Sequence, residues 1–371
     1  MKRLDSLTPE QEALMSVISQ KWIDRAMSGE FDEQAIATGV EWLYTDLLKS
    51  NKKPAIFFAD CPYSAISLIN LIKNNKKASV RASVGDSVGD SVRDSVWASV
   101  GASVRDSVGD SVWASVRDSV GASVGASVWD SVRDSVREIW NDRCRYIDYS
   151  DYAFTAWGEF FDTIGLDVVK NHETFQKFKP IIFGNPFMSW FYEGIAVIVR
   201  PPVLIKKDTD GRLHDINGAA IQFRNDTKLF FVHGRAMPEK LFREEFNIDD
   251  FMKEENEDVR AAMYEIAESK SGGFAKLSGA EIVSTETIVH GGGYTETIYL
   301  YKTKNTFKGT MDALTGKTDV QLAWLKLTCP STGQQYMIPS FPSFKTASEA
   351  ARHHRPQGIP TDLPYLWQSA S

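Results

Sequence analysis

The stretch DSVGDSVRDSVWASVGASV, residues 86–104, belongs to an array that repeats one four-residue unit. Fifteen copies of [Ala/Asp]-Ser-Val-[Gly/Arg/Trp] follow one another without interruption from Ala78 to Arg137. Each copy contributes one valine, and a short repeat that cannot bury its apolar side chain alone must do so against its neighbours. The structure that this period adopts therefore decides the architecture of the chain.

An α-helix is one candidate structure for the array. At 3.6 residues per turn, four residues turn by about 400°, so successive valines drift by about 40° around the helix axis. A flat partner cannot cover such a stripe, and Ser, Val and Gly are poorer helix formers than Ala. Asp and Arg three residues apart, as at Asp90 and Arg93, nevertheless favour a helix.

A solenoid is the other candidate, with each unit forming one short side of a coil and the valines stacked in ladders. Trp97, Trp113 and Trp129 are spaced 16 residues apart, which would place their indoles on one edge of the coil. The unit also resembles the pentapeptide repeat of quadrilateral β-helices with one residue removed. Aspartate at the small position counts against this structure, because burying an unpaired carboxylate is costly. We predict a β-solenoid-like rod, with a long α-helical array as the alternative.

The rest of the chain indicates an α+β protein with four parts. Residues 1–77 form an α-rich cap, residues 78–137 the array, residues 138–193 an aromatic-rich helical connector and residues 194–371 a β-rich domain. In the cap, Thr8 and Gln11 predict a capping box at the start of a helix, and PAIFFAD at 54–60 predicts a strand. In the β-rich domain, Asp-Gly, Asn-Gly and His-Gly pairs predict hairpin turns, and an acidic helix is expected from Asp249 or Asp250.

Composition limits the classes of function. The chain has 371 residues, a formal net charge of -7 and a pI near 5.5, which argues against general binding to nucleic acid or anionic membranes. Its three cysteines are far apart and indicate neither a disulfide framework nor a zinc site. We expect no signal peptide and no membrane span, and we predict a cytoplasmic protein without a cofactor or metal.

Several motifs are similar to those of a bacterial family that is filed as a domain of unknown function. They are DGRLHDINGAAIQF at 210–223, VHGRAMP at 232–238, EENEDVRAAMYE at 254–265 and YMIPSFPSFKTASEAA at 336–351. Ala219 stands where the family's hairpin motif has Pro, and Ala261 stands where its helix motif has a second Arg. The resemblance extends over almost the whole chain, often includes a four-residue repeat, and implies no established activity.

The hairpin segment carries the best candidate constellation for catalysis. It contains Asp208, Asp210, Arg212, His214, Asp215 and His233. A hairpin could bring His214 near His233, with a carboxylate such as Asp210 to orient an imidazole, as acid–base or metal sites require. The alternative is a surface turn in which Arg212 forms an ion pair and both histidines are ordinary strand residues.

Binding residues are expected elsewhere. Trp97, Trp113 and Trp129 would display hot-spot side chains on the array, and Arg212, Asn256 and Arg260 could face a partner or close a domain interface. GASVG at 121–125, HGGG at 290–293 and TGKT at 315–318 match fragments of hydrolase and P-loop motifs, but their order and context do not fit those sites.

These observations favour a non-enzymatic interaction or scaffold protein that uses the array as a rod or binding face for a protein partner. The alternative is an enzyme or metal-dependent protein with its site at the 208–233 hairpins. The sequence leaves the oligomeric state open.

Overall fold

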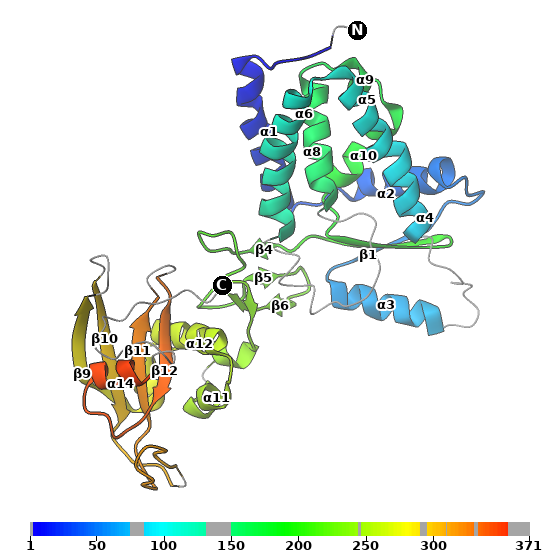
Figure 1. Cartoon of the computed structure of the whole chain (residues 1–371). Helices are drawn as coiled ribbons and strands as arrows, with labels where there is room; N and C mark the ends of the chain where they lie inside the picture. Colours follow the sequence, from blue (N-terminus) through cyan, green and yellow to red (C-terminus); the bar gives the residue numbers. More distant parts are fainter. Residues whose placement is uncertain are drawn as a thin grey trace. The chain divides into compact units, whose positions relative to one another are not determined.

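The computed structural model describes residues 3–74, 85–130, 150–243, 246–289, 295–308, 310–329 and 333–354. The chain divides into two compact units, the first made of Met1–His214 and Ala219–Leu229, the second of Asp215–Gly218 and Phe230–Ser371. The first unit contains most of the helices, and the second contains a four-stranded antiparallel sheet (Figure 1). The predicted α+β class is confirmed. The predicted borders after residues 77 and 137 fall outside the described ranges, and the border after residue 193 stays a prediction.

Apart from Val108 and Gly109, the described part of the array is helical, so the predicted β-solenoid is wrong and the helical alternative holds there. The first array helix consists of α4 (Gly85–Val92), η2 (Arg93–Ala98) and α5 (Ser99–Ser107). The second array helix begins with α6 (Asp110–Val116) and η3 (Arg117–Ala122) and ends with η4 (Gly125–Asp130). The η2, η3 and η4 segments are π-helical, which is rare in proteins.

These π-helical segments explain how a four-residue period fits a helix. A π-helical hydrogen bond spans one residue more than an α-helical one, so each π segment holds more residues per turn and removes part of the 40° drift of the α-helix. The valines consequently stay on one side of each helix. Every array valine from Val88 to Val124 is at most 3% exposed. Alternating α and π turns thus create a straight apolar column that a flat partner can cover.

The array turns between its two helices at Val108 and Gly109, which are both extended. Leu4 pairs with this break: its N–H donates to the Ser107 carbonyl at 3.0 Å, and its own carbonyl accepts the Gly109 N–H at 2.8 Å. A Cβ added at Gly109 would lie 3.2 Å from the Cα of Asp5. The N-terminal segment therefore fixes where the array bends.

Other helices complete the first unit. They are α1 (Pro9–Met27), α2 (Glu33–Trp42), η1 (Leu43–Leu47), α3 (Pro62–Asn74), α8 (Ser150–Thr163), α9 (Asp167–Lys170) and α10 (Glu173–Phe183). The predicted capping box of Thr8 and Gln11 is present at the start of α1. Helices α1 and α8 pack against the second array helix (Figure 1). Trp22 of α1 is fully buried and makes edge contacts with Tyr152 and Phe183.

A small mixed sheet joins distant parts of the first unit. Its strand order is β1 (Ala55–Ala59), β3 (Ile195–Val199) and β2 (Met188–Tyr192), with β1 parallel to β3 and β2 antiparallel to it. A second sheet contains three two-residue strands, β4 (Leu204–Ile205), β5 (Ile221–Gln222) and β6 (Lys228–Leu229). The predicted strand at 54–60 is confirmed as β1. Because β1 and β3 are parallel, their carboxyl ends lie at the same edge.

The second unit is built on the sheet β12–β11–β10–β9. These strands are β9 (Ala280–Val289), β10 (Thr295–Thr303), β11 (Ala323–Thr328) and β12 (Gln335–Ser340). Alternate residues face opposite cores: Trp324 lies in a cluster with residues of α12 (Glu257–Ser269) and α13 (Gly273–Ser278), and Leu325 lies in a cluster with α14 (Ala347–His353). Alternate side chains of a strand therefore enter the cores on opposite faces of the sheet.

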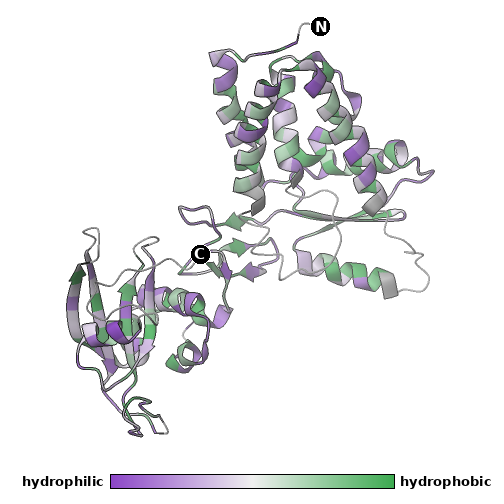
Figure 2. Ribbon diagram, viewed as in Figure 1, coloured by the Kyte–Doolittle hydropathy of each residue, from purple (hydrophilic) through white to green (hydrophobic). Residues whose placement is uncertain are grey.

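The second unit also contains the short elements β7 (Phe231–Val232), β8 (Arg235–Ala236), η5 (Glu239–Phe242) and α11 (Ile248–Lys253). The expected acidic helix is two helices, α11 and α12, which begin at the caps Asn247 and Asn256 rather than at Asp249 or Asp250. Figure 2 shows hydrophilic and hydrophobic residues mixed along the helices of each unit, as in amphipathic helices. No helix in the described ranges is long and apolar enough to span a membrane.

Candidate functional site

Cys61 lies at the carboxyl edge of the parallel pair β1 and β3. Strand β1 ends at Ala59, which pairs with Val199 at the end of β3. Asp60 and Cys61 follow β1 directly, and Arg200 follows β3. In sheets with parallel strands, ligands commonly bind beyond this edge.

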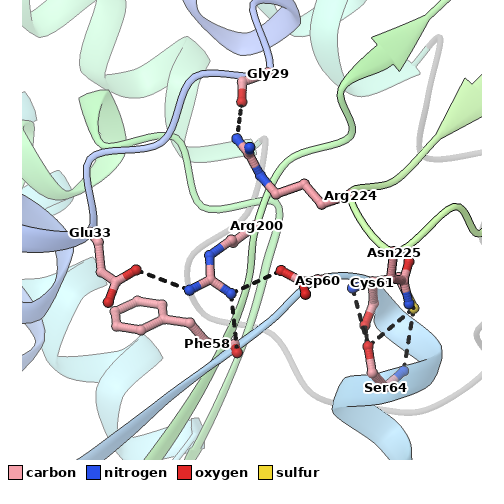
Figure 3. Close-up of polar contacts among 9 residues, drawn as sticks. All are labelled: Gly29, Glu33, Phe58, Asp60, Cys61, Ser64, Arg200, Arg224 and Asn225. Carbon is pink, nitrogen blue, oxygen red and sulfur yellow. Dashed lines mark hydrogen bonds and ion pairs between the residues drawn. The ribbon is translucent and has the colours of Figure 1, made fainter.

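The Cys61 thiol receives several hydrogen bonds, as Figure 3 shows for Ser64 and Asn225. Cys61 caps helix α3, because its sulfur accepts the Ser64 N–H at 3.4 Å. The Asn225 amide donates to Sγ at 3.2 Å and the Thr227 hydroxyl at 3.5 Å, and the Ser64 hydroxyl lies 3.1 Å from Sγ. Cys61 itself is only 1% exposed.

These contacts set the charge state of the thiol. Burial, the largest single effect, raises the pKa of Cys61, because it disfavours the thiolate. Hydrogen bonds from Ser64, Thr227 and Asn225 stabilise the thiolate and together outweigh burial, so that the pKa of Cys61 lies below its ordinary value. The position at a helix N-terminus acts in the same direction.

The tip of the β5–β6 hairpin covers this thiol. The tip carries Asn225 and Thr227, and Asp226 has the left-handed φ of 61° that closes the turn. Arg224 fixes the tip from the other side, since its guanidinium donates to the Gly29 carbonyl at 2.6 Å (Figure 3). The tip therefore contacts Sγ through Asn225 and Thr227.

Arg200 organises the edge beside the thiol. Its guanidinium donates to Asp60 at 2.9 Å, to Glu33 at 3.0 Å and to the Phe58 carbonyl at 3.3 Å (Figure 3). The pairing with Asp60 compensates a carboxylate that directly precedes Cys61 in the chain. This arrangement reduces the repulsion that a thiolate would otherwise meet there.

In the first unit, the structure places Asp210 and Arg212 in the loop of a short hairpin whose arms pair at Lys207 and Leu213, and His214 lies in its second arm. Arg212 forms ion pairs of 2.9 Å with both Asp208 and Asp210, and Gly211 adopts a φ of 81°. The backbone N–H of His214 donates to the Lys206 carbonyl at 3.0 Å. Arg212 therefore has the local ion-pair partners of the surface-turn alternative.

His233 and Asp215 belong to the second unit. His233 and Gly234 form a two-residue turn between β7 and β8 with positive φ at both positions, which confirms the predicted His-Gly hairpin turn. The His233 ring nitrogen Nε2 lies 2.9 Å from a Glu265 oxygen. Asp215 is buried and accepts the Asn217 N–H at 2.8 Å. Because His214 and His233 lie in different units, their joint catalytic site stays a prediction.

Asn256 and Arg260 stabilise the start of α12. The Asn256 side chain accepts the backbone N–H groups of Asp258 and Val259, as an N-cap does. Arg260 donates to the Glu254 carbonyl at 2.6 Å, and its side chain is 12% exposed. A further role of these two residues at an interface stays a prediction.

Trp97 and Trp113 of the array pack against α8. Trp97 stacks on Phe154 at a centroid distance of 5.1 Å, and Trp113 meets Trp157 edge-on at 5.1 Å. The two indoles belong to different array helices, so the stacked edge expected of the solenoid is wrong. The side chain of Trp129 lies outside the described residues. A binding role for the three tryptophans stays a prediction.

The hydrolase-like and P-loop-like fragments lie in helical and turn segments where the structure describes them. GASVG at 121–125 is helical, which differs from the strand–turn–helix geometry of a nucleophile elbow. TGKT at 315–318 follows Asp312 in a turn, and HGGG at 290–293 lies outside the described residues.

Sequence reasoning missed Cys61. The available signal was a strand followed by Cys-Pro-Tyr-Ser at the start of a helix, an arrangement in which the helix N-terminus activates a thiol. The donors Asn225 and Thr227 come from a hairpin more than 160 residues later. Their contribution could not be inferred from spacing.

No family model, curated protein or solved structure matches this chain. The resemblance to the bacterial family therefore stays a prediction.

Proposed function

We propose that the protein is a thiol-dependent redox protein in which Cys61 exchanges with small disulfides. The observation that carries this proposal is the convergence of donors from Ser64, Asn225 and Thr227 on one sulfur at the edge of a parallel strand pair. Thiolates rather than thiols are the nucleophiles in such exchange. A site that stabilises the anion keeps Cys61 ready to react near neutral pH.

The reaction is a single exchange step. The Cys61 thiolate attacks one sulfur of a small disulfide, a new S–S bond forms, and the other half leaves as a thiolate. The fourth residue of the Cys-Pro-Tyr-Ser segment is Ser64, which cannot form an internal disulfide. The mixed disulfide is therefore released by a second small thiol.

The hairpin tip controls access to this reaction. Cys61 is 1% exposed, so exchange requires the tip around Asn225 to open. The Arg224 contact with Gly29 holds the tip closed. Thiolate stability and access are thus governed by different residues, which allows an experiment to separate them.

The test is the pH dependence of mixed-disulfide formation on the full chain, with hydroxyethyl disulfide as the probe and mass spectrometry as the readout. A chain with Cys144→Ser and Cys329→Ser leaves Cys61 as the only thiol. We expect a midpoint below the value of about 8.5 for an ordinary cysteine. Asn225→Ala should raise the midpoint, and a rise of one pH unit leaves about tenfold less thiolate well below the midpoint.

Arg224→Ala is the matched control for access. It should raise the plateau rate at high pH and leave the midpoint in place, because Arg224 does not contact the sulfur. Absence of exchange at Cys61 in the folded chain, or a midpoint at or above about 8.5, would contradict the proposal.

A second candidate function is an interaction or scaffold role for the array. It is favoured by the straight column opposite the valines, where the first residue of most described units is exposed, as at Asp90, Asp94 and Asp106. Asp→Lys changes at these three positions should abolish cross-linking to a specific partner that the parent chain captures. The control variant carries three Asp→Lys changes elsewhere on the surface, in loops and at a helix start. Its changed residues are Asp210, Asp249 and Asp319. Equal loss in both variants would argue against the array as the binding face.

A further inference from the structure

Lys207 connects the short hairpin after β4 with the second array helix of the first unit. Its ammonium group donates to the Ser127 carbonyl in η4, 80 residues earlier in the chain. The backbone that carries Lys207 is fixed on both sides: Lys207 pairs with Leu213, and the Lys206 N–H donates to the Ala220 carbonyl at 2.8 Å. The amine is therefore presented to the array from a rigid support.

The described surroundings of this amine lack a carboxylate that pairs with it. The Ser127 carbonyl is neutral, and the residues of η4 around it, from Gly125 to Ser127, carry no charge. Asp208 follows Lys207 in the chain, but its carboxylate is engaged by Arg212 at 2.9 Å. Across the part of the chain that the structure describes, burial is the one effect that shifts the protonation of Lys207. The ammonium group thus loses water without gaining an opposite charge.

This environment makes Lys207 a better nucleophile than an ordinary lysine. Lys207 is partly buried, and burial lowers the pKa of its amine to about 8. At pH 7.5 about a quarter of such an amine is neutral, compared with about one in a thousand for an exposed lysine. Burial also lowers the pKa of Lys302 and Lys326, but carboxylates act against the shift at both. The neutral amine is the form that attacks an electrophile, so desolvation activates Lys207.

We propose that Lys207 is an acylation site of this chain and that acylation breaks its contact with the array. The donor class is an acyl phosphate, which reacts with a neutral amine without an enzyme. Nζ attacks the acyl carbon, an N–C bond forms, and the C–O bond to phosphate breaks. Phosphate leaves with the electron pair, and the nitrogen loses a proton to water. The resulting amide is uncharged and bulkier than the amine, so the bond to the Ser127 carbonyl is lost. The proposal does not depend on the reactivity of Cys61.

The first test is the acetylation rate of each lysine of the full chain in acetyl phosphate between pH 6.5 and 9.5, read by peptide mass spectrometry. Lys206 is the built-in reference, because it is adjacent and exposed. At pH 7.5 Lys207 should react about tenfold faster than Lys206 or more, and its rate should level off above pH 8. Hydroxylamine removes any acetyl group from Cys61 before digestion, because thioesters react with it and amides do not. A Lys207 rate no higher than that of Lys206, or one that still rises tenfold per pH unit at pH 9.5, would overturn the proposal.

The second test is hydrogen exchange of the array amides at 121–127 in the full chain. Acetylation of Lys207, or Lys207→Gln, should accelerate exchange there about fivefold, as expected for the loss of one ordinary hydrogen bond. Lys207→Arg keeps a charged donor, so it should exchange like the parent chain while removing the acetylation site. Lys206→Gln is the matched control and should leave exchange unchanged. Exchange at the parent rate in both the acetylated chain and Lys207→Gln would refute the effect on the array.

Discussion

The array of the first unit and the sheet of the second unit both bury regularly spaced apolar residues, but they reach this result by different means. In β11, a period of two matches the strand, so Trp324 and Leu325 enter different cores without any change of backbone. The array has a period of four, which differs from the 3.6 residues per turn of an α-helix. Its backbone changes instead, through π-helical segments such as η2 and η3.

Identical units within the array show what decides the local conformation. The tetrapeptide Asp-Ser-Val-Gly occurs at 86–89 in α4, at 106–109 across the break between the helices and at 118–121 in η3. Only the copy at 106–109 contacts Leu4. A contact from outside the array, not the unit itself, therefore selects where the array bends.

The largest loss of stability is expected when the four-residue period of the array is interrupted. One Ala inserted after Ala114 rotates Val116, Val120 and Val124 away from their column. Each valine that leaves the core costs about 1.5–3 kcal/mol, so three remove much of a typical stability of about 5–15 kcal/mol. Circular dichroism should show loss of helix and of the cooperative thermal transition. Insertion of Ser-Val-Gly-Ala at the same place preserves the column and should retain both; equal damage would contradict the four-residue fit.

In the second unit, the largest effect is expected at Trp324. Its side chain is fully buried and meets Phe274 edge-on at a centroid distance of 5.3 Å. Trp324→Ala should lower the free energy of unfolding by roughly 3–5 kcal/mol, through lost burial and a cavity. Urea unfolding followed by circular dichroism measures this change. Thr297→Ala, at an exposed position of β10, should stay within about 0.5 kcal/mol.

Substitution of Asn185 tests the contacts that hold the helices of the first unit together. It is fully buried with a φ of 69°, accepts the Tyr152 hydroxyl, and donates to the carbonyls of Arg25 at 2.9 Å and Glu30 at 3.0 Å. Asn185→Ala leaves these groups unpaired and places Ala in a left-handed conformation, so we expect a loss of roughly 2–4 kcal/mol. Asn185→Gly relieves only the backbone strain and should recover part of this loss in thermal unfolding.

A smaller effect should follow from pH at His172. This residue caps α10 by accepting the Phe175 N–H at Nδ1, and its Nε2 lies 3.0 Å from the Ser99 hydroxyl of the first array helix. Burial lowers the pKa of His172 below 6.5, so the unfolded chain binds the proton first. Stability should therefore fall as the pH drops below 6.5, and level off below the pKa of the folded state.

The change at His172 should be about 1 kcal/mol or less, which is the usual contribution of an N-cap. Urea unfolding at several pH values measures it. His172→Asn keeps a capping side chain without a titrating group and should flatten this part of the pH profile. An unchanged profile in that variant would assign the acid sensitivity to other residues.

Much of the fold outside the array follows from local signals. The capping box at Thr8, the strand before Cys61 and the turn at His233 each depend on a few neighbouring residues, and each is where the sequence predicts it. The array differs because its period of four does not match the 3.6 residues per turn of an α-helix, and the choice between coil and helix depended on partners such as Trp157. A β-solenoid was therefore predicted where a helix forms.

The candidate site was even less accessible to sequence reasoning. The helix cap provided by Cys61 is local, but the donors that lower its pKa come from the β5–β6 hairpin. The sequence predicted a site at Asp210, Arg212 and His233 because polar residues are clustered in that stretch. In the structure, Arg212 and Asp210 satisfy each other, and His233 is paired with Glu265.

The match between one unit and one helical turn has a consequence for the gene. Tandem coding repeats gain and lose copies by slippage of the replicating strands, and most such changes would rotate or shift the faces of a folded helix. Here a gained copy lengthens a helix by about a turn and leaves the outward column and the valine column in line. Array length can therefore vary between descendants of this gene without a new core having to be selected each time.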